Sequence, residues 1–131
     1  MDLALKNRKA IISGANRGIG RSIAAAYAAE GIHLALLGRN REACSALAQE
    51  IGKAHPAITC AAVFVDLEQT QTIRPAVEES VRALGGLDIL VNCAGGAYRG
   101  KLAEIPDEEW ERYFKVKPLG LIRMTREGGL E

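Results

Sequence analysis

A glycine-rich turn between two apolar stretches is the feature that most restricts the fold of this chain. Residues 10–26 read AIISGANRGIGRSIAAA, in which an apolar run precedes Gly14, Gly18 and Gly20 and an alanine-rich amphipathic segment follows them. This order predicts a strand, a tight turn and a helix. Glycines let the backbone approach an anion closely, and the start of the helix offers free N–H groups and a positive dipole end. The sequence therefore predicts a pyrophosphate site over residues 18–20.

The rest of the chain alternates short apolar runs with amphipathic segments. Strands are expected at residues 10–13, 32–37, 58–65 and 87–91, and helices at 19–30, 41–53, 69–84 and 106–126, the last kinked at Pro118. This alternation with short turns predicts an α/β fold with a parallel sheet, right-handed crossovers and helices on both faces. With a pyrophosphate loop first, the expected architecture is a Rossmann-type doubly wound sheet of strand order 3-2-1-4, truncated after the fourth strand and a long helix.

Composition excludes several classes of partner. The chain has 131 residues, a formal net charge of +1 and 25% charged residues, so it is expected to form one domain without the basic face that nucleic acid requires. No run approaches the roughly 18 apolar residues of a membrane span, and residues 1–10 do not resemble a signal peptide. Three cysteines without a C-x-x-C pair and two histidines outside any ligand pattern predict no metal site. We expect a cytoplasmic protein that binds neither nucleic acid nor a membrane.

Two further segments follow strands and carry polar or small residues. Residues 91–95 read VNCAG, in which Ala94 and Gly95 allow the backbone to pass beneath a flat ring or a ribose, and Asn92 can bond neighbouring backbone groups. The alternative is a plain turn that ends the strand. Asp66 and Leu67 follow the third expected strand, where the carboxylate of Asp66 either binds a ligand or caps the next helix.

These motifs resemble those of the short-chain dehydrogenase/reductase family. The family loop T-G-x-x-x-G-I-G is matched with Ser13 in place of Thr, which keeps the hydroxyl, and the family N-N-A-G is matched with Cys93 in place of the second Asn. The resemblance runs from Leu5 to Arg126. It implies a single dinucleotide-binding domain over residues 1–131, incomplete at its C-terminus, in which Asp66 accepts a hydrogen bond from the adenine amino group.

The residues and the resemblance together predict a nicotinamide dinucleotide site. Its cofactor-binding residues are Ser13, Gly14, Asn16, Arg17, Gly18, Ile19, Gly20, Arg39, Asp66, Leu67, Asn92, Ala94 and Gly95.

The charges near this site favour NADP over NAD. A site for NAD places Asp or Glu at the end of the second strand to bind the ribose 2′-hydroxyl, and that position is Gly38 here. Arg39 follows it, and Arg17 lies just before Gly18 in the glycine turn. Two guanidinium groups can bind a 2′-phosphate through charge-assisted bonds. The sequence therefore predicts NADP as the cofactor.

The residues that would catalyse the reaction are absent. The resemblance implies a catalytic Ser and a Tyr-x-x-x-Lys beyond a fifth strand, and no Ser follows Ser80. Tyr113 and Lys117 satisfy the spacing on one helix face. We reject them as a catalytic pair because no Ser precedes them on a strand, they lie too close to VNCAG, and Lys117 aligns with a family Asn that helps to build a proton relay. We therefore assign no catalytic residue.

Two functional hypotheses remain. The first is the NADP-binding part of a short-chain oxidoreductase that moves hydride between nicotinamide and a carbonyl or alcohol substrate, inactive as this chain alone. The second is a non-catalytic dinucleotide-binding or interaction module. Three explanations of the short length are considered. In order of preference they are an artificially shortened chain, a gene shortened by a frameshift, and a natural module.

The expected fourth strand also suggests self-association. Residues 87–91 would lie at a sheet edge with unpaired backbone groups. The last helix carries apolar residues that need a neighbour, namely Trp110, Phe114, Leu121, Ile122 and Met124. A homodimer or larger assembly is expected.

Overall fold

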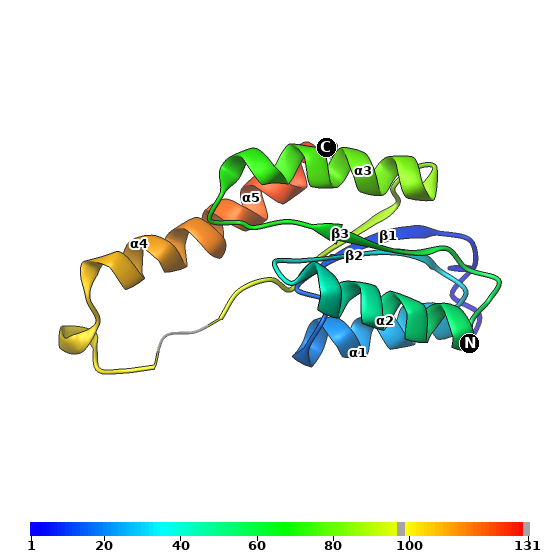
Figure 1. Ribbon diagram of the computed structural model, residues 1–131, viewed down its shortest axis with the longest axis horizontal. Coiled ribbons are helices and arrows are strands. Elements are labelled where there is room, and N and C mark those ends of the chain that lie inside the picture. Colours follow the sequence, from blue (N-terminus) through cyan, green and yellow to red (C-terminus); the bar gives the residue numbers. More distant parts are fainter. Residues whose placement is uncertain (97–98, 130–131) are drawn as a thin grey trace.

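Four parallel strands form one sheet in the order β3-β2-β1-β4 (Figure 1). The computed structural model describes residues 1–96 and 99–129. The strands are β1 (Lys9–Ser13), β2 (His33–Gly38), β3 (Cys60–Phe64) and β4 (Ile89–Asn92). This order confirms the predicted Rossmann-type arrangement. β1 and β2 lie inside the sheet and are apolar on both faces, because helices cover both sides of them.

Helices pack on both faces of the sheet, and one helix extends away from it (Figure 1). α1 (Gly18–Ala29) and α2 (Arg41–Ala54) cover one face, while α3 (Ile73–Leu84) and α5 (Pro118–Glu127) cover the other. α4 (Asp107–Val116) reaches out beyond the sheet. Two short 3-10 turns, η1 (Thr70–Thr72) and η2 (Leu102–Glu104), precede α3 and α4.

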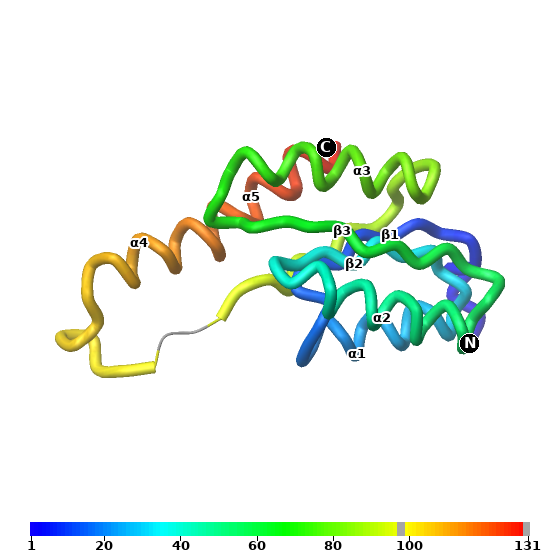
Figure 2. The backbone as a smooth tube through the Cα atoms, in the orientation of Figure 1, coloured from blue at the N-terminus to red at the C-terminus, as the bar shows by residue number. Residues whose placement is uncertain are grey.

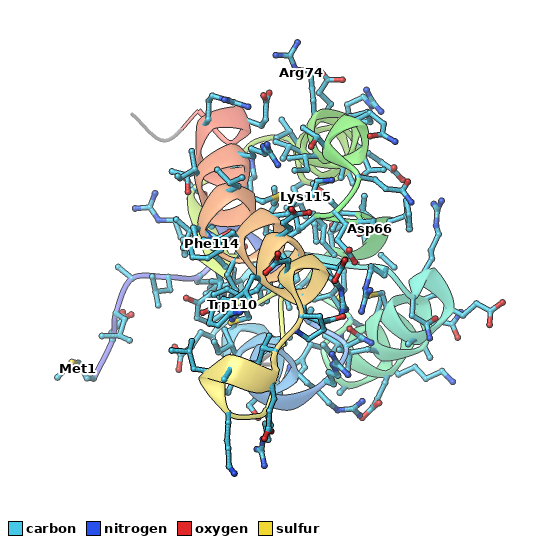
Figure 3. The ribbon with its side chains drawn as sticks, turned by 90° about the vertical axis from the view of Figure 1, so that its left-hand side faces the viewer. Met1, Asp66, Arg74, Trp110, Phe114 and Lys115 are labelled. Atoms are coloured by element: carbon cyan, nitrogen blue, oxygen red, sulfur yellow. The ribbon has the colours of Figure 1, made fainter. Side chains whose placement is uncertain are left out.

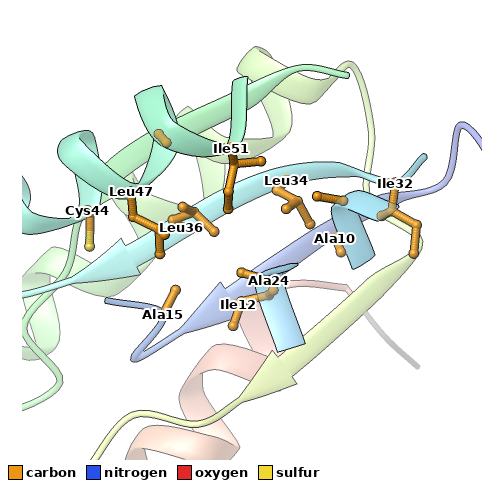
Figure 4. Close-up of a cluster of buried hydrophobic side chains, with 12 residues drawn as sticks. Ala10, Ile12, Ala15, Ala24, Ile32, Leu34, Leu36, Cys44, Leu47 and Ile51 are labelled. Atoms are coloured by element: carbon orange, nitrogen blue, oxygen red, sulfur yellow. The ribbon is translucent and has the colours of Figure 1, made fainter. Parts of the chain in front are cut away.

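The sheet separates two hydrophobic cores, because successive residues of a strand point to opposite faces. Ile12 of β1 and Leu36 of β2 pack with Leu47 and Ile51 of α2 on one face (Figure 4). Ile11, the neighbour of Ile12, packs on the opposite face with residues of α3 and α5. Both cores close around the same two central strands, so the ends of these strands are held firmly in place.

The carboxyl ends of the four strands lie at the same edge of the sheet. In Figure 2 the tube leaves each strand toward the side where α4 stands. Ser13 pairs in register with Leu37 of β2 and with Asn92 of β4. The turns that follow β1, β2 and β4 therefore begin at the same level, which brings three separate segments of sequence to one place.

The predicted helix over residues 106–126 is two helices in the structure. α4 ends at Val116, Lys117 leaves helical geometry with a ψ of −82°, and Pro118 begins α5. Proline lacks the N–H that would continue the first helix and is well suited to the first turn of the second. The prediction of a kink at Pro118 is confirmed, and the two helices meet at this break.

One expectation about the last helix is wrong. Met124 was expected to need a neighbouring molecule, but it is fully buried in the core formed with Ile11 and Leu37. The break at Pro118 explains the difference, because it lets α5 turn back onto the sheet beside α3. Phe114, Leu121 and Ile122 are 51–53% exposed. Along residues 1–96 and 99–129, β4 pairs with β1 alone, so its second edge is open.

Among the described helices, none combines the length and the apolar character that a membrane crossing requires.

Candidate dinucleotide-binding site

The turn after β1 has the backbone geometry that its glycines predicted. Gly14 has a φ of +68° and Gly18 a φ of +56°, values that residues with a Cβ rarely adopt. A Cβ on Gly20 would clash with the Gly14 carbonyl oxygen, so α1 starts directly beneath the turn. The turn is tied to β2, because the Gly14 N–H donates to the Leu37 carbonyl at 2.8 Å. These contacts fix the position of the first turn of α1.

The N-terminus of α1 is open to an anion. Arg17 occupies the N-cap position in extended geometry, and its side chain makes no capping hydrogen bond within the described residues. The first turn of α1 contains no acidic residue. The orphan N–H groups and the positive end of the helix dipole therefore have no acidic side chain in the first turn to neutralise them.

The loop after β4 rests against the glycine turn. A Cβ on Gly14 would lie 2.7 Å from the Cα of Ala94, so a side chain at position 14 would force the two loops apart. Ser13 joins the same loops: its hydroxyl accepts from the Ala94 N–H at 3.3 Å and donates to the Val91 carbonyl at 3.4 Å. Ser13 is fully buried, so its observed contacts are with the two loops rather than with the cleft.

Asp66 stabilises the turn that follows β3. One carboxylate oxygen, Oδ1, accepts from the Glu68 N–H at 3.0 Å, and the backbone of Asp66 is held by the Thr72 hydroxyl. The side chain thus closes an Asx turn and does not cap α3, whose N-cap is Thr72. The second carboxylate oxygen, Oδ2, has no hydrogen bond to any described residue, so it is available to a ligand. Leu67 is buried and packs against Gly120 of α5.

These segments surround a cleft of about 760 Å³, a size typical of sites for organic cofactors. The predicted residues that line it are Gly14, Asn16, Arg17, Arg39, Asp66, Leu67, Ala94 and Gly95. Five predicted residues do not line it, namely Ser13, Gly18, Ile19, Gly20 and Asn92. Of these, Gly20 is buried under the turn, whereas Ile19 is 76% exposed at the start of α1.

The end of β2 is tightly packed around Gly38. Gly38 is buried, and a Cβ there would lie 3.0 Å from the Cys44 Sγ and 3.3 Å from the Asn16 side-chain oxygen. Arg39 is exposed and lines the cleft, as does Arg17. Asn40 caps α2 by accepting from the Ala43 N–H at 3.0 Å. The position at which an NAD site would carry its carboxylate is thus a tightly packed glycine, and the next residue, Arg39, lines the cleft together with Arg17.

Sequence reasoning missed one wall of the cleft. One face of α4 and the residue after it, Lys117, line the cleft through Glu109, Arg112, Tyr113, Val116 and Lys117. Their spacing of three and four residues is the available signal, since it places side chains on a single helix face. In Figure 3, Trp110 and Phe114 lie on one flank of α4 and Asp66 lies on the other. The face toward the cleft is thus the polar one.

Tyr113 and Lys117 both reach the cleft, although we reject them as a catalytic pair. A Cβ on Gly95 would lie 2.6 Å from the Lys117 Cε, so the lysine stem covers the loop after β4. No serine is among the described residues that line the cleft. Burial raises the pKa of Cys60 to about 11 and also raises the pKa of Cys44, which disfavours the nucleophilic thiolate form of these two cysteines.

The sequence matches the short chain dehydrogenase family over residues 8–128, so the chain belongs to this family. It is 35% identical over 124 residues to a sorbitol dehydrogenase of Cereibacter sphaeroides, and the matched region covers 95% of this chain and 46% of that protein. It is 30% identical over 131 residues to a D-threitol dehydrogenase of Mycolicibacterium smegmatis, and the matched region covers 98% of this chain and 48% of that protein. The chain spans about half the length of the curated relatives it matches.

Solved structures share the fold. An L-sorbose reductase from Gluconobacter frateurii, complexed with NADPH and L-sorbose, superposes with a TM-score of 0.91 at 30% identity, over 97% of this chain and 48% of that one. A short-chain dehydrogenase from Brucella melitensis gives a TM-score of 0.88 at 29% identity, over 98% and 53%. The four-stranded unit described above is therefore the shared part of longer family members.

The contact between the loops after β1 and β4 gives a first prediction. Gly14→Ala should lower the free energy of unfolding by roughly 1–2 kcal/mol or more, because a Cβ is unfavourable at positive φ and meets Ala94. Gly52→Ala is the matched control, since Gly52 lies in α2 with no atom within 4 Å of an added Cβ. It should raise stability by roughly 0.5–1 kcal/mol. Urea denaturation measures both, and an equal response of the two variants would contradict the contact.

Proposed function

We propose that this chain binds NADP(H) in the cleft and forms the cofactor-binding part of a short-chain oxidoreductase. The observation that carries the proposal is the end of β2, where a tightly packed glycine, Gly38, takes the place of a carboxylate while Arg17 and Arg39 line the same cleft. Guanidinium groups bind phosphate through charge-assisted hydrogen bonds. The NADPH complex of the similar L-sorbose reductase supports a nicotinamide dinucleotide.

Different residues of the cleft would bind different parts of such a cofactor. The N-terminus of α1 would hold the pyrophosphate, because it offers N–H groups and a positive dipole end. The unbonded carboxylate oxygen of Asp66, Oδ2, would accept from the adenine amino group. The loop at Ala94 and Gly95 would lie beneath the nicotinamide riboside. The nicotinamide supplies hydride chemistry when bound, and this chain's contribution is to orient it.

The reaction proposed for the whole protein is hydride transfer between nicotinamide and a carbonyl or alcohol substrate. The names of similar proteins, a sorbitol dehydrogenase and a D-threitol dehydrogenase, support small polar alcohols as the class. We propose that this chain alone does not catalyse the reaction, because it carries no Ser after Ser80. We place the protein in the cytoplasm, supported by the free thiols of Cys44, Cys60 and Cys93.

A second prediction concerns the choice of cofactor. Calorimetry should show tighter binding of NADPH than of NADH. Arg39→Asp should reduce this preference by roughly 1–3 kcal/mol, because a charge-assisted bond to the 2′-phosphate is lost. Arg82→Asp is the charge-matched control, since Arg82 is exposed in the last turn of α3, away from the cleft lining. Equal affinities of the parent chain for NADPH and NADH would refute the proposal.

A third prediction concerns Tyr113. The purified chain should reduce no carbonyl substrate above background, and Tyr113→Phe should leave that background unchanged. General acid–base work requires a group that is tuned and placed against the substrate, and the described residues of the cleft lining offer Tyr113 no serine partner. NADPH oxidation followed at 340 nm with aldehyde and ketone panels is the measurement. Turnover that Tyr113→Phe abolishes would show that the Tyr113–Lys117 pair is catalytic.

A fourth prediction concerns assembly. We propose a homodimer or larger assembly, supported by the open edge of β4 and by the exposed Phe114, Leu121 and Ile122. Light scattering coupled to size exclusion should give a mass of at least twice 14.0 kDa at micromolar concentration. Phe114→Glu and Ile122→Glu together should shift the chain toward monomer, because a charged group in an apolar interface is costly. A stable 14.0 kDa species in the parent chain would contradict the proposal.

A further inference from the structure

One carboxylate joins two arginines at the rim of the cleft. Glu68 follows the turn after β3, and its Oε2 lies 3.6 Å from the Nη1 of Arg39 and 3.2 Å from the Nε of Arg112. Arg39 directly follows β2 and Arg112 lies in α4, so three segments that are distant in sequence meet here. All three residues line the cleft. The side chain of Glu68 is 31% exposed, which leaves its charge only partly screened by water.

The pairing of Glu68 with Arg39 bears on the recognition of a 2′-phosphate. Under the proposed function, Arg39 must offer its guanidinium to that phosphate, and part of the same guanidinium already faces the Glu68 carboxylate. Two anions that approach one cation repel each other, so Glu68 opposes the phosphate. NADH has no phosphate at this position, and its binding does not meet this repulsion.

Arg112 acts against this effect. Its contact with Glu68 is shorter than the contact between Arg39 and Glu68. Among the described contacts, the pair of Arg112 with Glu68 is also a hydrogen bond, whereas the pair of Arg39 with Glu68 is an ion pair only. The hydrogen bond to Glu68 and the charge of Glu68 are the main causes that raise the pKa of Arg112. A second carboxylate, Glu109, lies 3.5 Å from the Nη1 of Arg112 and holds the guanidinium on this side of α4. Arg112 can therefore keep the Glu68 charge partly neutralised when Arg39 turns to a phosphate.

We propose that Glu68 sets how strongly the site discriminates between NADPH and NADH, by competing with the 2′-phosphate for Arg39, and that Arg112 limits this competition. The inference rests on the proposed function. Glu68 acts through Arg39 and is a positioning residue, with no contact to the cofactor required of it. The wall formed by α4 thereby contributes to cofactor choice without touching the 2′-phosphate.

The test measures the dissociation constants of NADPH and NADH by calorimetry for three variants. Glu68→Gln should tighten NADPH binding about two- to fivefold, the range expected of a partly exposed ion pair, and leave NADH unchanged. Arg112→Gln should weaken NADPH binding by a similar factor and leave NADH unchanged. In the double variant, the effect of Arg112→Gln should disappear, because the charge that Arg112 neutralises is gone.

A matched control separates local from overall charge. Glu50→Gln changes the net charge equally, and Glu50 pairs with Arg21 at 3.1 Å with neither residue lining the cleft. It should leave the ratio of the two dissociation constants unchanged. The Glu68→Gln effect should also shrink as salt rises from about 0.05 to 1 M, because ions screen partly exposed charges.

The outcomes distinguish the inference from the proposed function. An unchanged ratio of NADPH to NADH affinity in Glu68→Gln, or weaker NADPH binding, would overturn the inference and leave the proposed function standing. Equal weakening of both nucleotides in Arg112→Gln would show that Arg112 only holds α4, which also overturns it. A parent chain that binds neither nucleotide would refute the proposed function and this inference with it.

Discussion

The approach of the loop after β4 to the glycine turn after β1 is the contact on which the site depends. Gly14 and Ala94 are close enough that a single Cβ would separate them, and the buried Ser13 hydroxyl joins the same two segments. This contact leaves the start of α1 open and places Ala94 and Gly95 beside it. A parallel sheet makes the approach possible, because all of its strands end at one edge.

The site combines a rigid base with a wall that is less supported. The turns after β1, β2 and β4 begin in register on strands whose side chains are held in two cores. α4 instead stands beyond the sheet (Figure 1), and the ion pair of Arg112 with Glu68 connects it to the turn after β3. Partly exposed ion pairs contribute little stability, so their consequence here lies in the electrostatics of the cleft.

The sequence predicted the parts of the molecule that depend on local chemistry. Glycines at positive φ, continuous apolar strands and the proline break at Pro118 each follow from the backbone preferences of single residues. The glycine turn follows from these preferences, and the strand order was predicted from the alternation of strands and helices behind a pyrophosphate loop. The contact of Gly14 with Ala94 depends on strand pairing over 80 positions, and the sequence indicated it only through two separate motifs.

The parts that were missed depend on the direction of a helix. The cleft-facing side of α4 and the burial of Met124 both depend on how far the chain turns between Val116 and Pro118, which residue types alone do not determine. Glu68 was missed for a different reason, because its partners Arg39 and Arg112 are 29 and 44 positions away in the sequence. Ser13 was predicted to bind the cofactor, and its observed contacts are with the loops after β1 and β4. The sequence does not distinguish these roles, because a hydroxyl can bond a ligand or the backbone.

The measurement that tests the account most directly is a titration of the ¹⁵N-labelled chain with NADPH, followed by amide chemical shifts. The account predicts that the largest changes fall on residues 14–20, 38–41, 66–68 and 94–96, which are far apart in sequence and meet at one edge of the sheet. Residues of the α3–α5 face should change little. Changes centred on that face, or changes at residues 14–20 without any at 94–96, would contradict the claim that the two loops form one site.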